Sequence, residues 1–178
     1  IYSILFYAFF SITGHRQTIA TAAALYSFEW IKKRKLFPFV FLLIIFSTIH
    51  KSVLIFLPFY FIGNIKQTKL IYIISLILFP FLMISRNQFS YFFKVLGGYD
   101  IYGVNTEANT FNFTVLYFLI MFLAYNRMKH VLKLYKNSRY YYNALAVGLL
   151  FIPLTWVNPS AMRIVQYFSI FMLIIIPF

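Results

Sequence analysis

The feature that most constrains this sequence is a series of apolar runs separated by short polar clusters. Several runs approach the roughly 20 residues that a helix needs to cross a hydrocarbon layer about 30 Å thick. Of the 178 residues, 62% are hydrophobic and 11% are charged. A soluble domain of this length cannot bury so much apolar surface, because its surface is still large relative to its volume. We therefore expect lipid to be the solvent of this chain.

The apolar runs favour helices over strands. They are long and continuous and show no alternation of period two. An open sheet edge is also excluded in lipid, where every backbone donor and acceptor needs an internal partner. We predict an all-α fold, a polytopic transmembrane helical bundle that is compatible with a glycosyltransferase-C-like membrane architecture. We expect residues 1–178 to form a single transmembrane domain, an interior piece of a longer multi-pass protein.

The alternation of runs and polar clusters predicts where the elements lie. We expect helical segments at residues 1–13, 18–31, 37–49, 53–62, 70–84, 112–126, 141–157 and 161–178. We expect turns or loops at residues 14–17, 32–35, 63–69, 85–111, 127–139 and 158–160.

His50 and Lys51 interrupt residues 36–62, which carry no other charge. As one helix, this stretch would reach about 39 Å and bury both side chains near the bilayer centre. A charge at that depth costs at least about 2.5 kcal/mol. We therefore predict a bend at residues 50–52, giving a broken or re-entrant helix pair whose polar break is reached by water or an anionic ligand.

The distribution of basic residues predicts the orientation. Suppose that the cluster at residues 32–35 is cytoplasmic and that successive polar clusters alternate between the two sides of the membrane, with residues 37–62 returning to their starting side. Eleven of the sixteen lysines and arginines then lie inside, as the positive-inside rule requires. These eleven are Lys32, Lys33, Arg34, Lys35, Lys66, Lys69, Arg127, Lys129, Lys133, Lys136 and Arg139. The remaining five are Arg16, Lys51, Arg86, Lys94 and Arg163.

This orientation places Arg16, His50, Lys51 and Arg163 together at the outer ends of their segments. Arginine offers a planar fork for phosphate oxygens and lysine a point charge, so the four residues predict an anion site. The chain has only three acidic residues. Glu29 is expected to pair with Lys33, one turn away, and no acid accompanies the outer cations inside the apolar runs. We therefore expect a substrate to be their counter-ion.

The composition also excludes several kinds of partner. The chain has no cysteine, which rules out disulfides and thiolate metal sites. It has no acidic cluster for a divalent metal, and we expect no cofactor. The basic residues are spread between apolar runs, and the sequence contains no module that reads nucleic-acid bases. We therefore expect the net charge of +13 to favour binding to anionic membrane lipids and not to nucleic acid.

Three stretches resemble the EpsG family of Wzy-type bacterial polysaccharide polymerases. GHRQTIATAAALYSFEWIKKRK is similar to the family's Arg-Gln pair opening an Ala-rich helix that ends in basic residues. IIFSTIHKSVLIFLPFY resembles its His-Lys-Ser step, and NPSAMRIVQYFSIFMLIIIP its later helix with Arg and aromatic residues. The resemblance implies a multi-pass protein of the bacterial cytoplasmic membrane that joins polyprenyl-diphosphate-linked oligosaccharides into exopolysaccharide, capsule or O-antigen on the outer face, alongside a flippase and a chain-length regulator.

The resemblance also implies roles for individual residues. Arg16, Gln17, Lys51, Ser52 and Arg163 would bind substrate, with the cations at the departing diphosphate. His50 would be the catalytic residue, because a neutral imidazole accepts a proton near neutral pH. No metal would be needed.

Two other functions fit the same cations. An oligosaccharide ligase uses the same donor chemistry with a different acceptor. A transporter or flippase of lipid-linked sugars would also present cations to a diphosphate, but we would expect an internal repeat and cations reached from both faces.

The predicted orientation is tested by cysteine labelling, since the chain has no cysteine of its own. Cysteine at position 133 should be protected from an impermeant thiol reagent added outside intact cells, whereas cysteine at position 160 should be labelled. Labelling of position 133 from outside would refute the orientation.

Overall fold

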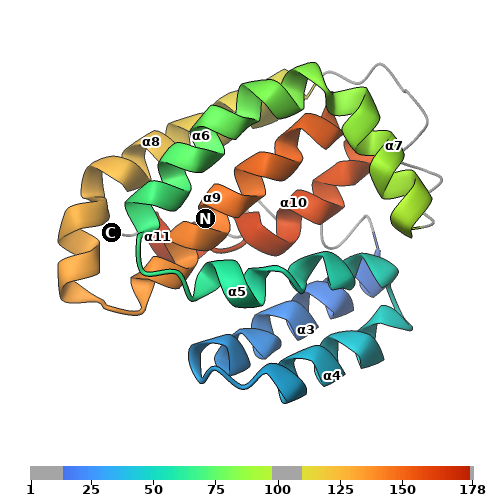
Figure 1. Cartoon of the computed structure of the whole chain (residues 1–178), viewed down its shortest axis with the longest axis horizontal. Coiled ribbons are helices and arrows are strands. Elements are labelled where there is room, and N and C mark those ends of the chain that lie inside the picture. Colours follow the sequence, from blue (N-terminus) through green and yellow to red (C-terminus); the bar gives the residue numbers. More distant parts are fainter. Residues whose placement is uncertain (1–13, 98–109, 177–178) are drawn as a thin grey trace. The chain divides into compact units, whose positions relative to one another are not determined.

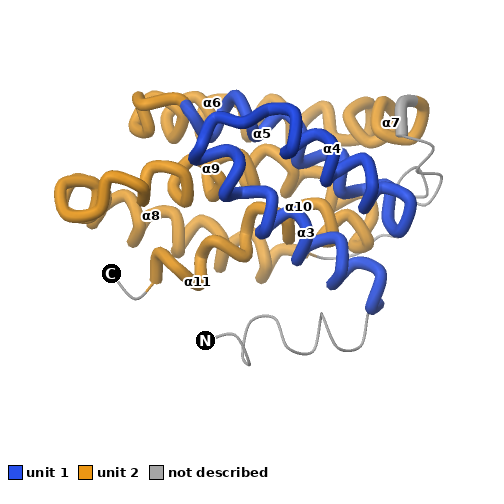
Figure 2. The backbone as a smooth tube through the Cα atoms, turned by 90° about the horizontal axis from the view of Figure 1, so that it is seen from below, with its two compact units in different colours: residues 1–64 blue, residues 65–178 orange. Residues whose placement is uncertain are grey.

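The structure is a computed structural model that describes residues 14–97 and 110–176, and these residues form helices and their connections without strands, which confirms the all-α prediction (Figure 1). The chain divides into two compact units, Ile1–Asn64 and Ile65–Phe178 (Figure 2). The helical segment expected at residues 1–13 lies outside the described residues.

The first unit contains three helical layers. Its elements are α3 (His15–Lys32), α4 (Leu36–Ser47), the 3-10 helix η1 (Lys51–Phe56) and α5 (Phe59–Gly63). The start of α3 contacts the start of η1 through Gln17 and Ser52. The end of α3 contacts the end of α5, where Asn64 Nδ2 donates to the carbonyl of Ile31 at 3.4 Å. The pair η1–α5 therefore runs in the same direction as α3.

Ring contacts show that the chain reverses between α4 and η1–α5, at a break of residues 48–50 that lies slightly before the bend predicted at residues 50–52. The ring of Phe39, near the start of α4, lies 5.3 Å from the ring of Tyr60 in α5 and 6.3 Å from that of Phe56. A single straight helix over residues 36–62 would separate these side chains, so the chain reverses between them. With twelve residues, α4 is about 18 Å long, which is shorter than the hydrocarbon layer.

The reversal is made by polar side chains that bond the backbone. The hydroxyls of Ser47 and Thr48 donate to the carbonyls of Ile44 and Ile45, each at 2.7 Å, and so satisfy acceptors in the last turn of α4. Thr48 and its neighbour Ile49 then lead into the extended backbone of His50 (φ −152°, ψ 106°).

The connection from α3 to α4 corrects one predicted ion pair. Glu29 pairs with Lys32, three residues on, and not with Lys33, whose ammonium lies 5.4 Å from the ring centre of Trp30. Arg34 then takes the left-handed conformation (φ 53°) that closes a Schellman turn at the helix end.

The second unit is organised around one buried helix. Its elements are α6 (Thr68–Ile84), α7 (Arg86–Gly97), α8 (Phe111–Leu134), α9 (Ser138–Thr155), η3 (Pro159–Ala161), α10 (Met162–Ser169) and α11 (Met172–Ile175). α9 packs against α6, α8, α10 and α11, and Figure 1 shows it flanked by α6 and α10. Fourteen of its eighteen residues are buried.

Several predicted boundaries are wrong. The helix expected at residues 37–49 ends at Ser47, and the one expected at residues 53–62 is divided into η1 and α5. The turn expected at residues 14–17 is already helical from His15, because Gly14 alone takes the turn conformation. Residues 86–97 of the expected loop form α7, and α8 continues through Leu134 into the expected basic loop. The single helix expected at residues 161–178 is divided into α10 and α11.

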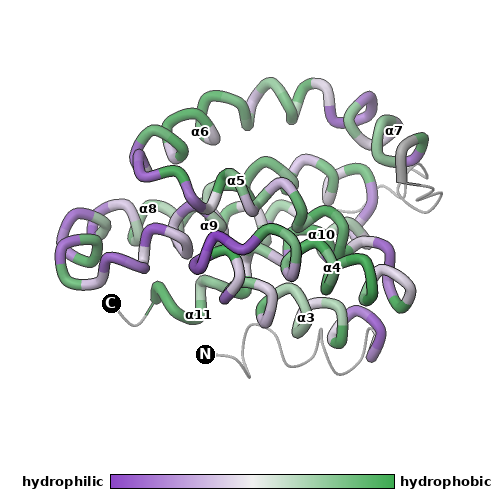
Figure 3. Tube along the Cα trace, turned by 60° about the horizontal axis from the view of Figure 1, so that its bottom comes forward, coloured by the Kyte–Doolittle hydropathy of each residue, from purple (hydrophilic) through white to green (hydrophobic). Residues whose placement is uncertain are grey.

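The apolar exterior of the described helices indicates association with a membrane. α8 is the one described helix that is long and apolar enough to cross a bilayer alone, and α6 with α7 passes as a pair bent by 88°. Large side chains on α6 and α8 are exposed, including Ile77, Phe81 and Phe122. Figure 3 shows the apolar character of α4 and α6. Such continuous apolar surfaces are unusual on soluble monomers.

Polar side chains fix α8 against α9. The hydroxyl of Tyr117 donates to the carbonyl of Leu145 at 2.8 Å, and Trp156 Nε1 donates to Thr114 Oγ1 at 2.9 Å. Gly148 leaves the space for the first contact, since a Cβ there would lie 2.0 Å from the Tyr117 hydroxyl oxygen. A small residue thus allows close approach of two helices joined by an interhelical hydrogen bond.

We expect Gly148→Ala to lower the free energy of unfolding by about 1–3 kcal/mol, because overpacking outweighs the gain in helix propensity. Tyr117→Phe removes the oxygen that the new methyl group meets. The double variant should therefore recover part of the loss in thermal unfolding experiments in detergent. Equal stability of Gly148→Ala and wild type would contradict this packing.

Candidate functional site

The structure brings two of the predicted segments together at one end of the first unit. Ser52 Oγ in η1 donates to Gln17 Oε1 in α3 at 3.5 Å, and Gln17 Nε2 donates to Thr21 Oγ1 at 3.4 Å. Both Gln17 and Ser52 are buried. These bonds are long and therefore weak, but they show that the two segments are in contact at this point. Arg16 and Lys51, their chain neighbours, consequently lie at the same end of the unit.

The two cations differ from the buried pair in their exposure. Arg16 and Lys51 are both exposed. Arg16 lies in the first turn of α3, whose preceding residue Gly14 (φ 143°) accepts hydrogen bonds from the backbone of Gln17 and Thr18. The first N–H groups of a helix carry partial positive charge. The end of the unit therefore combines two exposed cationic side chains with the positive end of an 18-residue helix.

His50 occupies the reversal itself. Its backbone N–H donates to the carbonyl of Phe46 at 3.0 Å, and its carbonyl accepts from Val53 at 3.2 Å. The backbone of His50 is thus held from both sides of the break. Its side chain is half-buried with Nε2 shielded, in contrast to the neighbouring Lys51.

The charges around this end of the unit are unbalanced. Glu29 is the one carboxylate in the described part of the chain, since Asp100 and Glu107 lie outside it. Glu29 pairs with Lys32 at the far end of α3, roughly 20 Å from Arg16 along the helix. No carboxylate of the described ranges therefore neutralises Arg16 or Lys51. Within the same ranges, no group of His, Asp and Glu side chains is arranged to hold a metal ion.

Arg163 belongs to the second unit, in the first turn of α10. Asn158 Oδ1 accepts a hydrogen bond from the backbone of Ser160 at 2.9 Å and so begins the short helix before it. Arg163 is half-buried. Its convergence with Arg16, His50 and Lys51 on one outward-facing cavity stays a prediction.

The sequence analysis missed Gln166, one turn after Arg163 on α10. It is 3% exposed, and both its amide oxygen and its amide nitrogen lack a hydrogen-bond partner among the described residues. A buried amide without partners costs free energy and calls for a ligand, a water or another residue. The sequence did contain a signal for this residue, because Gln166 is a polar residue three positions after Arg163 in an otherwise apolar stretch.

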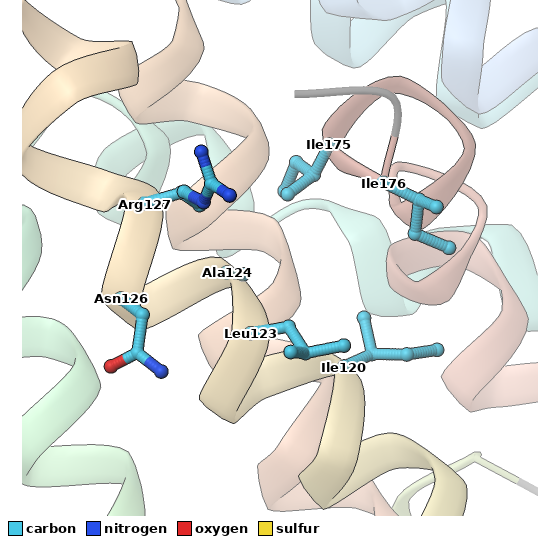
Figure 4. A pocket seen from close by; sticks show the side chains of 7 residues that line it. All are labelled: Ile120, Leu123, Ala124, Asn126, Arg127, Ile175 and Ile176. Carbon is cyan, nitrogen blue, oxygen red and sulfur yellow. The ribbon is translucent and has the colours of Figure 1, made fainter.

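Three cavities in the second unit are lined by none of the predicted site residues. One of about 590 Å³ lies between α8 and α11, and Figure 4 shows the side chain of Arg127 reaching toward Ile175 while Asn126 points away. Two others, of about 780 Å³ and 270 Å³, lie between α6 and α8.

Comparison with known proteins identifies a family. A sequence model described as the EpsG family matches residues 1–178. No curated protein and no solved structure matches the chain.

The meeting of α3 with η1 can be tested by crosslinking in the cysteine-free chain. The pair Gln17→Cys and Ser52→Cys should be joined efficiently by a short bifunctional thiol reagent. The control pair Gln17→Cys and Asn64→Cys should not be joined, because residue 64 lies at the other end of α3. Equal crosslinking of both pairs would contradict the parallel arrangement of α3 and η1–α5.

Proposed function

The chain belongs to the EpsG family, and from that premise we propose that it joins polyprenyl-diphosphate-linked oligosaccharide repeat units into a polysaccharide. Membership indicates a polysaccharide polymerase-type role, and the apolar helices indicate association with a membrane. The finer proposal is a multi-pass membrane glycosyltransferase of the bacterial cytoplasmic membrane that acts on its outer face. Exopolysaccharide, capsule and O-antigen are the candidate products.

One observation carries the proposal: the Gln17–Ser52 contact brings Arg16, His50 and Lys51 to one end of the first unit. A diphosphate leaving group needs cations aimed at its oxygens as charge develops there. Arg16 and Lys51 are exposed, and no described carboxylate neutralises them. In this proposal the diphosphate of the donor lipid is their counter-ion, and the N-terminus of α3 adds to the attraction.

The reaction breaks one bond and forms one. A sugar hydroxyl of the acceptor attacks the anomeric carbon of the donor glycan, through a transition state that resembles an oxocarbenium ion. The bond from that carbon to the diphosphate oxygen breaks, and the diphosphate departs with the electron pair. The hydroxyl proton needs an acceptor. His50 is assigned this role, because a neutral imidazole accepts a proton and the backbone on both sides of the break fixes its position.

Gln17 and Ser52 receive a positioning role in the proposal. Both side chains are buried and bonded to each other, so they hold α3 against η1 beneath the exposed cations. Arg163 is assigned to the diphosphate as a third cation, with Gln166 beside it on α10. A flippase supplying the donor and a regulator of chain length are the partners that this role implies.

Removing a cation should slow polymerisation more than it changes folding. We expect Arg16→Ala, Lys51→Ala and Arg163→Ala each to lose roughly 2–4 kcal/mol of transition-state stabilisation, which is about 30- to 1000-fold in rate. Arg→Lys at positions 16 and 163 should recover only part, since the fork geometry is lost. The measurement is the ladder of longer chains formed from purified lipid-linked repeat units.

Two comparisons sharpen this experiment. Lys94→Ala removes a half-buried cation of α7 that has no role in the proposal, and it should leave the rate within about threefold. His50→Ala should slow turnover of bound donor while donor binding persists. Loss of binding without loss of turnover would make His50 a phosphate ligand. Transfer of the glycan to an unrelated acceptor, with no ladder, would instead indicate a ligase.

A further inference from the structure

We propose that the groove between α6 and α8 binds an anionic phospholipid, with the headgroup at the lysines near its open end and an acyl chain along its apolar part. The groove uses none of the residues assigned to polymerisation. The proposal therefore stands or falls independently of the proposed function.

The open end of the groove is a basic cavity of about 780 Å³. Lys66, Lys69 and Lys129 line it, together with the amides of Gln67 and Asn126. All three lysines are exposed, and the described part of the second unit contains no carboxylate that would neutralise them. The cavity also lies at the N-terminus of the 17-residue helix α6, where backbone N–H groups favour an anion.

The other part of the groove is an apolar cavity of about 270 Å³. It is lined by Ile73 and Leu76 of α6 and by Phe118 and Phe122 of α8. Tyr125 lines both cavities, so they adjoin each other at this residue.

Tyr125 also marks the boundary between the polar and the apolar part. Lys69 Nζ lies 5.9 Å from the centre of its ring, and the ring of Tyr72 lies 6.3 Å away. Tyrosine is common at such boundaries, because its ring is apolar and its hydroxyl is polar. Phe118 of the apolar cavity also meets the ring of Phe79 edge to face at 4.9 Å, which joins α6 to α8 beside the groove.

A phospholipid matches a basic cavity that adjoins an apolar cavity better than a soluble anion does. A free phosphate would use the lysines but leave the apolar cavity empty. Exposed Ile77 and Leu119 continue the apolar surface beside the groove, and hydrocarbon solvates such side chains better than water. The predicted orientation places Lys66, Lys69 and Lys129 on the cytoplasmic side, where anionic lipids attract basic residues.

Lipid binding to the purified full chain in a neutral detergent tests the proposal. Native mass spectrometry would follow titration with phosphatidylglycerol and with phosphatidylcholine of the same acyl chains. We expect phosphatidylglycerol to bind at least about tenfold more tightly, given the contribution of each lysine near an anionic headgroup. The variant with Lys66→Gln, Lys69→Gln and Lys129→Gln should lose this preference.

A control with the same change in net charge separates the groove from bulk attraction. The control variant replaces three lysines that are also exposed but line none of these cavities: Lys33→Gln, Lys133→Gln and Lys136→Gln. This variant should keep the preference for phosphatidylglycerol. Equal loss in both triple variants would overturn the proposal, as would equal affinity for the two lipids in the wild type.

A second variant tests the apolar part separately. Leu76→Trp should fill the cavity and weaken binding of long-chain phosphatidylglycerol about tenfold, while binding of a short-chain analogue changes little. Unchanged long-chain binding in this variant, complete displacement of the lipid by inorganic phosphate, or preferential binding of a polyprenyl diphosphate in the groove would each overturn the assignment to a phospholipid.

Discussion

Every interruption of a helix in this apolar chain leaves backbone groups that hydrocarbon would not satisfy. The structure meets that constraint with polar side chains at the breaks. Ser47 and Thr48 bond the last turn of α4, Ser85 Oγ donates to the carbonyl of Phe81 where α6 ends, and Asn158 holds the turn after α9. At residues 47–52 the irregular backbone and the polar side chains of the hairpin therefore coincide.

The hairpin at residues 36–63 was largely predictable from the sequence. A histidine and a lysine within an uncharged apolar stretch are costly in any continuous helix, so the break follows from solvation alone. The contact between Gln17 and Ser52 was not predictable in this way, because it depends on the direction in which η1–α5 returns along α3. The resemblance placed both residues at the site, whereas the structure shows them buried and bonded to each other.

The wrong boundaries at α7 and α8 share a physical cause. Residues 86–97 were expected to be a loop because Arg86, Asn87 and Gln88 end an apolar run, yet Phe89 and Phe93 lie one turn apart on α7 and both contact Phe151. In α8 the charges after residue 126 are exposed, while Met128 and Val131 stay buried. Polarity marks where a hydrophobic run ends, but a helix continues as long as one face remains apolar.

The hairpin of the first unit has a consequence for how this part of the chain can vary. Its first residue, Leu36, follows the turn at the end of α3, and its last, Gly63, precedes Asn64, which is bonded to the same end of α3. The hairpin thus begins and ends at the same end of α3. Insertions or deletions matched in its two arms would move the polar break at residues 48–50 along α3 and leave the two ends of the hairpin in place. Variation in the arms can therefore reshape the break without changing where the chain enters and leaves the hairpin.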